Sequence, residues 1–159
     1  MSRWTRTLQE AAVAGALASV LSAAVLAVAG RRETPGAAAP INAVSQWLWG
    51  RHEALAADDA DRRHTLNGYL IHHLASTFWA VLHTAALQRS AVPARPLPAL
   101  AAATATSAVA AFVDLRCTPE RLTPGFQHRL SSRALAATYG AFAIGLALGC
   151  LVMRRGRAA

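Results

Sequence analysis

Lysine is absent from this chain, and all 16 of its basic residues are arginine. The arginines are spread along the sequence between apolar runs and do not gather into a basic patch interleaved with aromatic side chains. Such a patch is the usual electrostatic footprint of a nucleic-acid-binding domain. In spite of the formal net charge of +8, we expect no nucleic-acid partner, and we interpret the arginines as the flanks of membrane segments.

Charged residues are also missing from four long stretches of the chain. Each stretch is close to the roughly 20 residues that a helix needs to cross the hydrocarbon core of a bilayer. A helix of a soluble bundle carries polar side chains along the face that points away from the core, and these stretches do not provide such a face. The four stretches are residues 11–30, 65–88, 96–113 and 134–153.

The sequence therefore predicts an all-α fold, namely a polytopic membrane protein whose single domain, residues 1–159, is a bundle of four transmembrane helices. Its expected partners are the lipid bilayer and either a second copy of the chain or another membrane protein. The third span is the weakest, because it contains few of the Leu, Ile, Phe and Val residues that drive insertion. The expected spans are residues 8–30, 65–88, 97–115 and 134–153.

The first span has a second interpretation, as a secretory signal peptide. Arg3 and Arg6 precede an apolar stretch, and residues 27–29 (Ala-Val-Ala) resemble a cleavage site with small residues. The apolar stretch is longer than the core of an ordinary signal peptide, and Arg31 and Arg32 follow it directly. We favour a span that is retained.

Four spans place both long loops on one side of the membrane and both termini on the other. Arg3 and Arg6 flank the first span, which usually dominates orientation, so we expect both termini in the cytoplasm. The raw count favours the opposite orientation slightly, since nine arginines fall on the loop side and seven on the terminal side.

The first long loop contains a segment, residues 40–50, that is too short to cross the membrane. Trp47 and Trp49 are of the type that settles at headgroup depth, so the segment is expected to lie in the interface. An alternative makes Asn42, Ser45 and Gln46 the lining of a small polar mouth.

The second long loop, residues 118–131, contains two Thr-Pro pairs, each of which suits the start of a short helical turn. This segment is also expected at the interface. The residues expected on the common face of the two loops are Asn42, Trp47, Trp49, Arg121 and His128.

An acidic cluster lies in the first loop, where Asp58, Asp59, Asp61 and His64 fall within seven residues. Its spacing does not fit an EF-hand loop, and it lacks the glycine and the final glutamate of that motif. We interpret it as a solvated cap at the start of the second span, and we expect no bound metal.

Three histidines lie in the second span, which contains no charged residue. At 100° per residue, His72 and His83 share one face of a helix with Tyr69 and Ser76, whereas His73 points about 100° away. An unpartnered polar side chain is costly in lipid. The stripe of Tyr69, His72, Ser76 and His83 is therefore predicted to form a polar seam that faces other helices.

Asp114 is an acid at the end of the expected third span. If the second and third spans are antiparallel, it lies at the depth of residues 69–72, so we predict a contact from Asp114 to His72 or His73. The competing partner is Arg116, which would draw Asp114 to the interface.

Haem ligation is disfavoured by geometry, because two histidines on one face of one helix cannot face each other across an iron atom. The other three spans contain no histidine, so a haem would need Met153 or a second chain. No cofactor is expected. Cys117 and Cys150 fall near opposite membrane faces in a four-span arrangement, which excludes a disulfide between them.

Three segments together resemble a group of small bacterial inner-membrane proteins with four predicted transmembrane helices and no assigned function. The segments are APINAVSQWLWG, RHTLNGYLIHHLASTFWA and RLTPGFQHRLS. The resemblance covers residues 37–131 and implies a bacterial inner-membrane location, without naming a substrate or a catalytic residue.

Neither a phosphate-binding loop nor a nucleophile elbow is present in the sequence, so we expect no enzyme. The leading hypothesis is a non-enzymatic accessory or assembly protein that acts through its loops and its polar seam. The alternative is a small transporter or proton-linked carrier that uses His72, His83 and Asp114. A redox subunit that binds haem or quinone is the third hypothesis.

Overall fold

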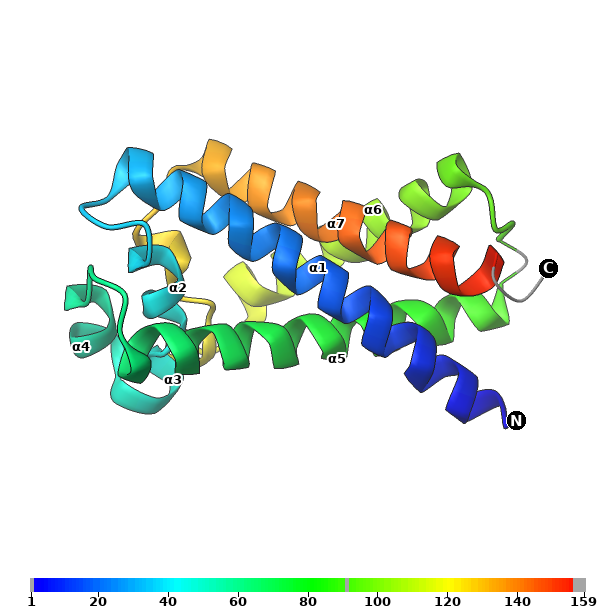
Figure 1. Cartoon of the computed structure of the whole chain (residues 1–159), viewed down its shortest axis with the longest axis horizontal. Coiled ribbons are helices and arrows are strands. Elements are labelled where there is room, and N and C mark those ends of the chain that lie inside the picture. The colour runs from blue at the N-terminus through cyan, green and yellow to red at the C-terminus, as the bar shows by residue number, and fades with distance from the viewer. Residues whose placement is uncertain (1, 91, 156–159) are drawn as a thin grey trace.

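The computed structural model describes residues 2–90 and 92–155, and every regular element in these ranges is a helix. Four long helices run side by side and form the body of the molecule (Figure 1). The all-α prediction is therefore confirmed. The long helices are α1 (Arg3–Glu33), α5 (Asn67–Arg89), α6 (Pro96–Phe112) and α7 (Ser132–Arg155).

Short helices gather at one end of the body, opposite the start of α1 and the end of α7 (Figure 1). They belong to two segments, residues 34–66 and 117–131, which pack together and which we call the cap. The short helices of the first segment are α2 (Ala39–Val44), α3 (Gln46–Trp49), α4 (Arg51–Ala56) and the π-helical turn η1 (Arg62–Leu66). Those of the second are the 3-10 turns η3 (Glu120–Leu122) and η4 (Phe126–His128).

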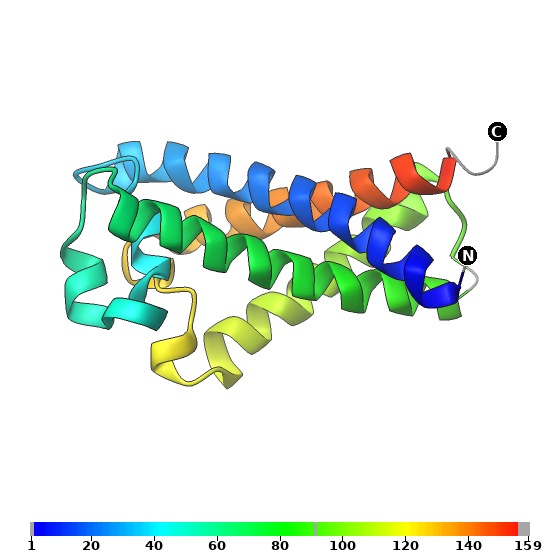
Figure 2. The same cartoon turned by 60° about the horizontal axis from the view of Figure 1, so that its bottom comes forward.

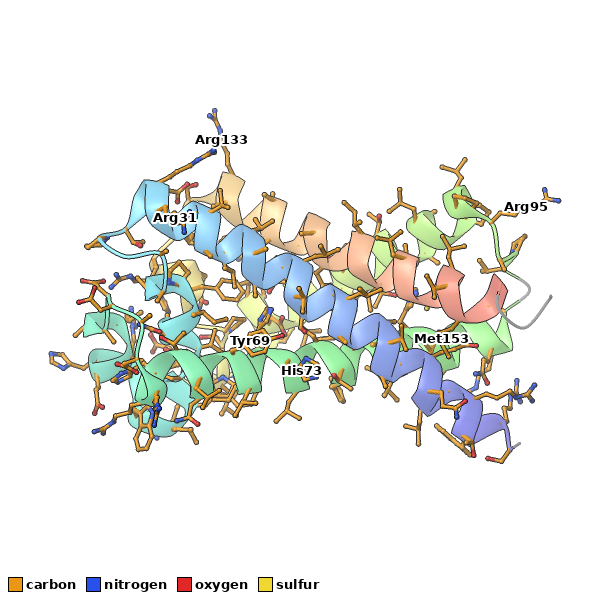
Figure 3. All side chains as sticks on the ribbon, in the orientation of Figure 1. Arg31, Tyr69, His73, Arg95, Arg133 and Met153 are labelled. Carbon is orange, nitrogen blue, oxygen red and sulfur yellow. The ribbon has the colours of Figure 1, made fainter. Side chains whose placement is uncertain are left out.

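Another π-helical turn, η2 (Val113–Cys117), joins the end of α6 to the cap. Figure 3 shows the two ends of the molecule, with Arg31 and Arg133 at the cap end and Arg95 and Met153 at the other end. The two long loops thus lie on the same end of the bundle, as the order of the helices requires.

Within the described residues, three helices are long and apolar enough to cross a membrane. They are Arg3–Glu33, Pro96–Cys117 and Ser132–Arg154. The segment that the sequence rates as the weakest span is among them, because mean hydropathy counts its many alanines as apolar. The helix α5 is not among them, because its three histidines count as strongly polar.

The helix α1 lies between α5 and α7, and α6 packs against the outer side of α7. The contact between α1 and α7 is so close that backbone meets backbone. A Cβ atom added at Gly145 would lie 2.4 Å from the Cα atom of Ala18, and one added at Gly149 would lie 2.3 Å from that of Ala14. Rows of small residues allow helices to approach this closely. The row at 141, 145 and 149 is therefore a packing surface.

On the opposite side of α1, Gly15 meets α5 at a similar distance, since an added Cβ atom would lie 2.8 Å from the Cα atom of Thr77. In contrast, α5 and α6 have few contacts with each other. In Figure 2 the cap end of α6 stands apart from α5. The four long helices thus form an arc whose outer members, α5 and α6, have few contacts with each other.

We predict that Gly145→Ala lowers the stability of the bundle by about 1–3 kcal/mol, because the new methyl group overlaps α1. The matched control is Gly140→Ala on the same helix, where an added Cβ meets nothing within 4 Å. The control is expected to be as stable as the parent or slightly more stable, because alanine favours a helix over glycine. Unfolding of the purified protein in mixed detergent micelles measures both variants, and equal stabilities would contradict the close contact.

Candidate functional site

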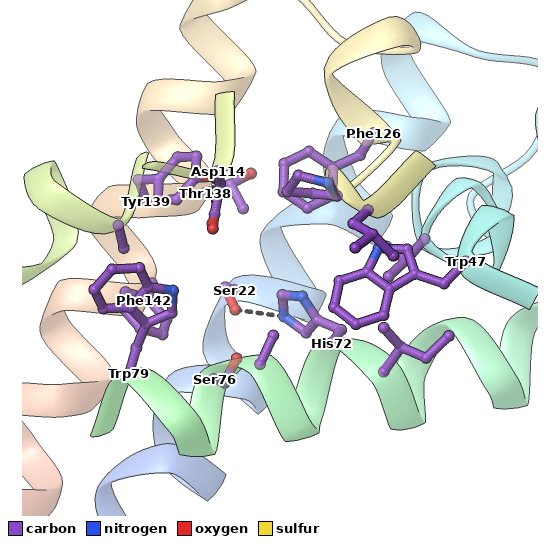
Figure 4. Close-up of a pocket in the computed structure, with 16 residues that line it drawn as sticks. Ser22, Trp47, His72, Ser76, Trp79, Asp114, Phe126, Thr138, Tyr139 and Phe142 are labelled. Carbon is purple, nitrogen blue, oxygen red and sulfur yellow. Dashed lines mark hydrogen bonds between the residues drawn. The ribbon is translucent and has the colours of Figure 1, made fainter. Parts of the chain in front are cut away.

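A cavity of about 60 Å³ lies beneath the cap, between α1, α5, α7 and the end of α6 (Figure 4). We call this cavity the chamber. Its walls combine apolar and aromatic side chains with a few polar ones. The polar residues that line it are Ser22, His72, Ser76, Asp114, Thr138 and Tyr139.

His72 enters the chamber from α5, where its Nε2 atom lies 2.9 Å from the Oγ atom of Ser22 on α1. The hydroxyl of Ser22 donates its proton to the carbonyl of Ala18, four residues earlier in α1, at 2.7 Å. A hydroxyl has one proton to give. We therefore assign the Nε2 atom of His72 as the donor and Ser22 as the acceptor.

The other two histidines of α5 repeat this arrangement. The Nδ1 atom of His73 lies 2.8 Å from the hydroxyl of Ser19, which donates to a carbonyl of its own helix. The Nδ1 atom of His83 lies 2.8 Å from the hydroxyl of Thr106 on α6, and Thr106 donates to the carbonyl of Ala102. Each histidine thus donates to a hydroxyl on a neighbouring helix.

Asp114 enters the chamber from another wall. It lies on the π-helical turn η2, where α6 ends, and its Oδ2 atom accepts a hydrogen bond of 3.0 Å from the hydroxyl of Tyr139 on α7. The indole of Trp79 lies beside the same carboxylate. Figure 4 shows Asp114 and the pair of Ser22 and His72 on different sides of one space.

The predicted contact between Asp114 and His72 or His73 is therefore wrong. His72 and His73 are hydrogen-bonded to serines of α1, and the carboxylate of Asp114 is hydrogen-bonded to Tyr139. Asp114 and His72 nevertheless line the same chamber.

The structure divides the predicted polar seam into three parts. Ser76 lines the chamber with His72, and only 3% of its surface is exposed. Tyr69 instead stacks on His73, with ring centroids 6.1 Å apart, and does not line the chamber. His83 lies on the α6 side and belongs to a separate contact.

Sequence reasoning overlooked Ser22 and Tyr139 as members of this site. The signal for Ser22 was present, because Ser19 and Ser22 are polar residues three apart in an apolar span, on adjoining turns of one helix face. Nothing in the order of residues points from Tyr139 to Asp114, because that contact depends on how α7 packs against α6.

Buried amide side chains hold the cap together, Gln46 between its two segments and Asn42 within the first. Gln46 donates to the carbonyls of Glu120 and Thr123, at 3.1 and 2.8 Å. Asn42 donates to the carbonyls of Ala57 and Asp59, at 3.0 and 2.8 Å.

Asn42, Ser45 and Gln46 are fully buried, so the alternative that placed them around a polar mouth is wrong. The side chains of Asn42 and Gln46 hold the inside of the cap together.

The two tryptophans of the cap have different environments. Trp47 lines the chamber and donates from its indole nitrogen to the carbonyl of Thr123, at 3.1 Å. Trp49 donates to the carbonyl of Arg63, at 3.1 Å, and the guanidinium group of Arg63 stacks 4.4 Å above its ring.

Most of the charged side chains on the cap surface form ion pairs with one another. Arg51 pairs with Glu120, and Arg129 pairs with Asp58. Arg121 reaches the carbonyls of Trp47 and Leu48.

Asp61 accepts a hydrogen bond from the backbone N–H of His64 and is the N-cap residue of η1. This position agrees with the interpretation of the acidic cluster as the N-terminal end of the second span. This bond lowers the pKa of Asp61 below its ordinary value. Within the described residues, no group of three or more His, Cys, Asp or Glu residues is arranged to hold a metal ion. Cys117 and Cys150 are both free thiols.

Comparison with known proteins adds no relative to this description, because the chain matches no protein-family model, no curated protein and no solved structure. The fold and the chamber define the class of the protein as an all-helical bundle with membrane-length helices.

We predict that the imidazole of His128 titrates below its ordinary pKa of 6.5. Partial burial lowers this pKa, the guanidinium group of Arg51 lowers it further, and Glu120 opposes both effects. As the pH falls through 6.5, the unfolded chain takes up the proton first, so acidification weakens the cap.

NMR titration of His128 tests this prediction. Arg51→Gln is expected to raise the pKa, because it removes a neighbouring positive charge. Glu120→Gln is expected to lower the pKa, because it removes the opposing negative charge. A midpoint at 6.5 or above that is insensitive to both substitutions would contradict the prediction.

Proposed function

We propose that this chain is a four-span integral protein of the bacterial inner membrane that acts without catalysis, as an accessory or assembly subunit. The bacterial setting is supported by the resemblance of residues 37–131 to small inner-membrane proteins. The observation that carries the proposal is the chamber, a small and mainly apolar cavity with a few polar groups in its walls, at the cap end of a closely packed helical bundle.

The outward face of α5 supports its role as the fourth span. A large apolar side chain stands at every fourth position of this face, and its members are between 45% and 67% exposed. A row of this kind is a liability in water and is suited to contact with lipid. The row consists of Leu66, the last residue of η1, and of Leu70, Leu74, Phe78 and Leu82 on α5.

The inward face of α5 supports the same role. All three of its histidines have a hydroxyl partner on a neighbouring helix. Polar groups inside a membrane are tolerated when they face the bundle interior and find such partners. The hydropathy of α5 is therefore lowered by residues that do not face the lipid.

The distribution of charge supports an orientation with both termini in the cytoplasm. Arg3 and Arg6 precede the first span and follow the rule that positive flanks stay inside. At the cap end, three arginines are already paired with acids of the cap itself. These are Arg51, Arg63 and Arg129.

The packing of α1 favours an accessory subunit over a carrier. A carrier has to move one part of its bundle against another. Here α1 meets α7 at Gly145 and Gly149, and it meets α5 at Gly15, with no space for a side chain at these points. Asp114 and His72 share the chamber, as a carrier would require, but His83 bonds to Thr106 outside it, so the three proposed relay residues are not gathered in one place.

We predict that α5 is inaccessible from water in intact membranes. In a background of Cys117→Ser and Cys150→Ala, Leu74→Cys is expected to resist a membrane-impermeant maleimide until detergent is added. Arg62→Cys on the cap is expected to react in intact cells, and Arg95→Cys only after the inner membrane is permeabilised. Rapid labelling of Leu74→Cys in membranes would contradict the assignment of α5 as a span. Labelling of Arg95→Cys in intact cells, with Arg62→Cys labelled only after permeabilisation, would indicate the opposite orientation.

Purification from native membranes tests the accessory role. A second membrane protein is expected to copurify in fixed stoichiometry. Leu48→Glu, which changes an exposed apolar residue of the cap, is expected to reduce its recovery, whereas Arg62→Gln is expected to leave recovery unchanged. Proton-coupled uptake by the protein alone in liposomes, abolished by Asp114→Asn, would instead establish a carrier.

A further inference from the structure

Aromatic side chains surround the chamber on several sides. They come from the cap, from α5 and from α7 (Figure 4). The face of an aromatic ring attracts a cation, and cages of such rings are how proteins recognise ammonium groups that carry methyl substituents. The aromatic residues that line the chamber are Trp47, Trp79, Phe126, Tyr139 and Phe142.

The chamber also has the charge that a cation requires. Among the described residues that line it, Asp114 is the one with a formal charge. Its carboxylate accepts the hydroxyl of Tyr139. The remaining titratable group at the walls is His72, which donates to Ser22 as described above. A positive guest is therefore drawn to Asp114.

The volume of the chamber limits the guest to a small group. One water-sized group needs about 10–15 Å³ of such space, so the 60 Å³ of the chamber accommodates about four to six groups of this size. The head of a trimethylammonium group has four heavy atoms and is in this range, and any further substituent on the nitrogen has to extend through the opening of the chamber.

Entry to the chamber is from the side of the bundle, at the level of the cap. Two residues of its lining are exposed at the surface, Trp47 at 37% and Leu122 at 44%. Trp47 belongs to α3 and Leu122 to η3, so this opening lies between the two cap segments and the long helices. In a membrane this opening would lie near the headgroup layer, so a guest could arrive as a free solute or on a lipid headgroup.

We propose that the chamber is a binding site for a small methylated ammonium group, held by the carboxylate of Asp114 and the faces of the surrounding aromatic rings. This inference rests on the proposed function in one respect, because the four-span arrangement places the opening of the chamber at the membrane surface. The inference adds the chemical class of the ligand that the chamber binds.

Calorimetric titration of the purified chain in a nonionic detergent, with tetramethylammonium chloride as the probe, tests the site. Saturable binding is expected that sodium chloride at equal ionic strength does not reproduce. Asp114→Asn is expected to weaken binding at least tenfold. The matched control is Asp59→Asn, an exposed cap acid that does not line the chamber, and it is expected to bind as the parent does.

A second pair of variants keeps the test decisive if Asp114→Asn fails to fold. Trp47→Ala removes one ring face and is expected to weaken binding about threefold to thirtyfold, in line with the strength of cation–π contacts. Trp47→Phe keeps a ring and is expected to restore most of the affinity. Absence of saturable binding, or binding that is unchanged in both Asp114→Asn and Trp47→Ala, would overturn the proposal.

The source of the ammonium group is distinguished by two nanodisc preparations, one of phosphatidylglycerol alone and one that also contains phosphatidylcholine. Weaker apparent binding of tetramethylammonium in the second preparation would identify the choline headgroup as the occupant, whereas equal binding in both would identify a free solute. Failure of the binding test leaves the maleimide labelling of Leu74→Cys unaffected, so the ligand and the four-span proposal are judged separately.

Discussion

The hydrogen bond from each histidine of α5 to a hydroxyl on a neighbouring helix is the interaction on which this bundle depends. A buried imidazole without a partner would carry a large desolvation cost. Ser19 and Ser22 meet that need for two of the histidines and Thr106 for the third. Since serine or threonine within a helix readily donates to the carbonyl three or four residues earlier, each hydroxyl keeps its lone pairs available to the imidazole. The three contacts also fix the rotation of α5 about its axis, with its apolar row facing outward.

These hydrogen bonds in turn need helices that lie close together. A short serine side chain reaches an imidazole on the next helix only because α1 and α5 approach closely at Gly15. On the other face of α1, Gly145 and Gly149 bring α7 equally near. The small residues and the polar residues of α1 therefore have one joint effect. The small residues set the distance between helices, and the polar residues set which helix faces which.

The sequence was sufficient for the parts of the structure that depend on periodicity. The absence of charge predicted helices of membrane length, and the angular spacing of His72, Ser76 and His83 predicted that they face the interior of the bundle. The partner of Asp114 could not be predicted in the same way. Periodicity gives the face of each helix and the depth of each residue, but the choice between His72 and Tyr139 depends on which helices are neighbours. That choice goes to Tyr139 because α6 packs against α7 and has few contacts with α5.

The cap and the chamber are formed by the same few residues, which links the exposed and the buried parts of the molecule. Gln46 ties the two cap segments together through Glu120 and Thr123, and the next residue, Trp47, is a wall of the chamber that bonds to the same Thr123 carbonyl. Any shift of the second cap segment would therefore move Trp47 relative to Asp114. The occupancy of the chamber and the shape of the cap surface are then coupled thermodynamically, because a guest that contacts both Trp47 and Asp114 favours the arrangement of the cap that brings them together. A protein partner that binds the cap would sense in this way whether the chamber is filled.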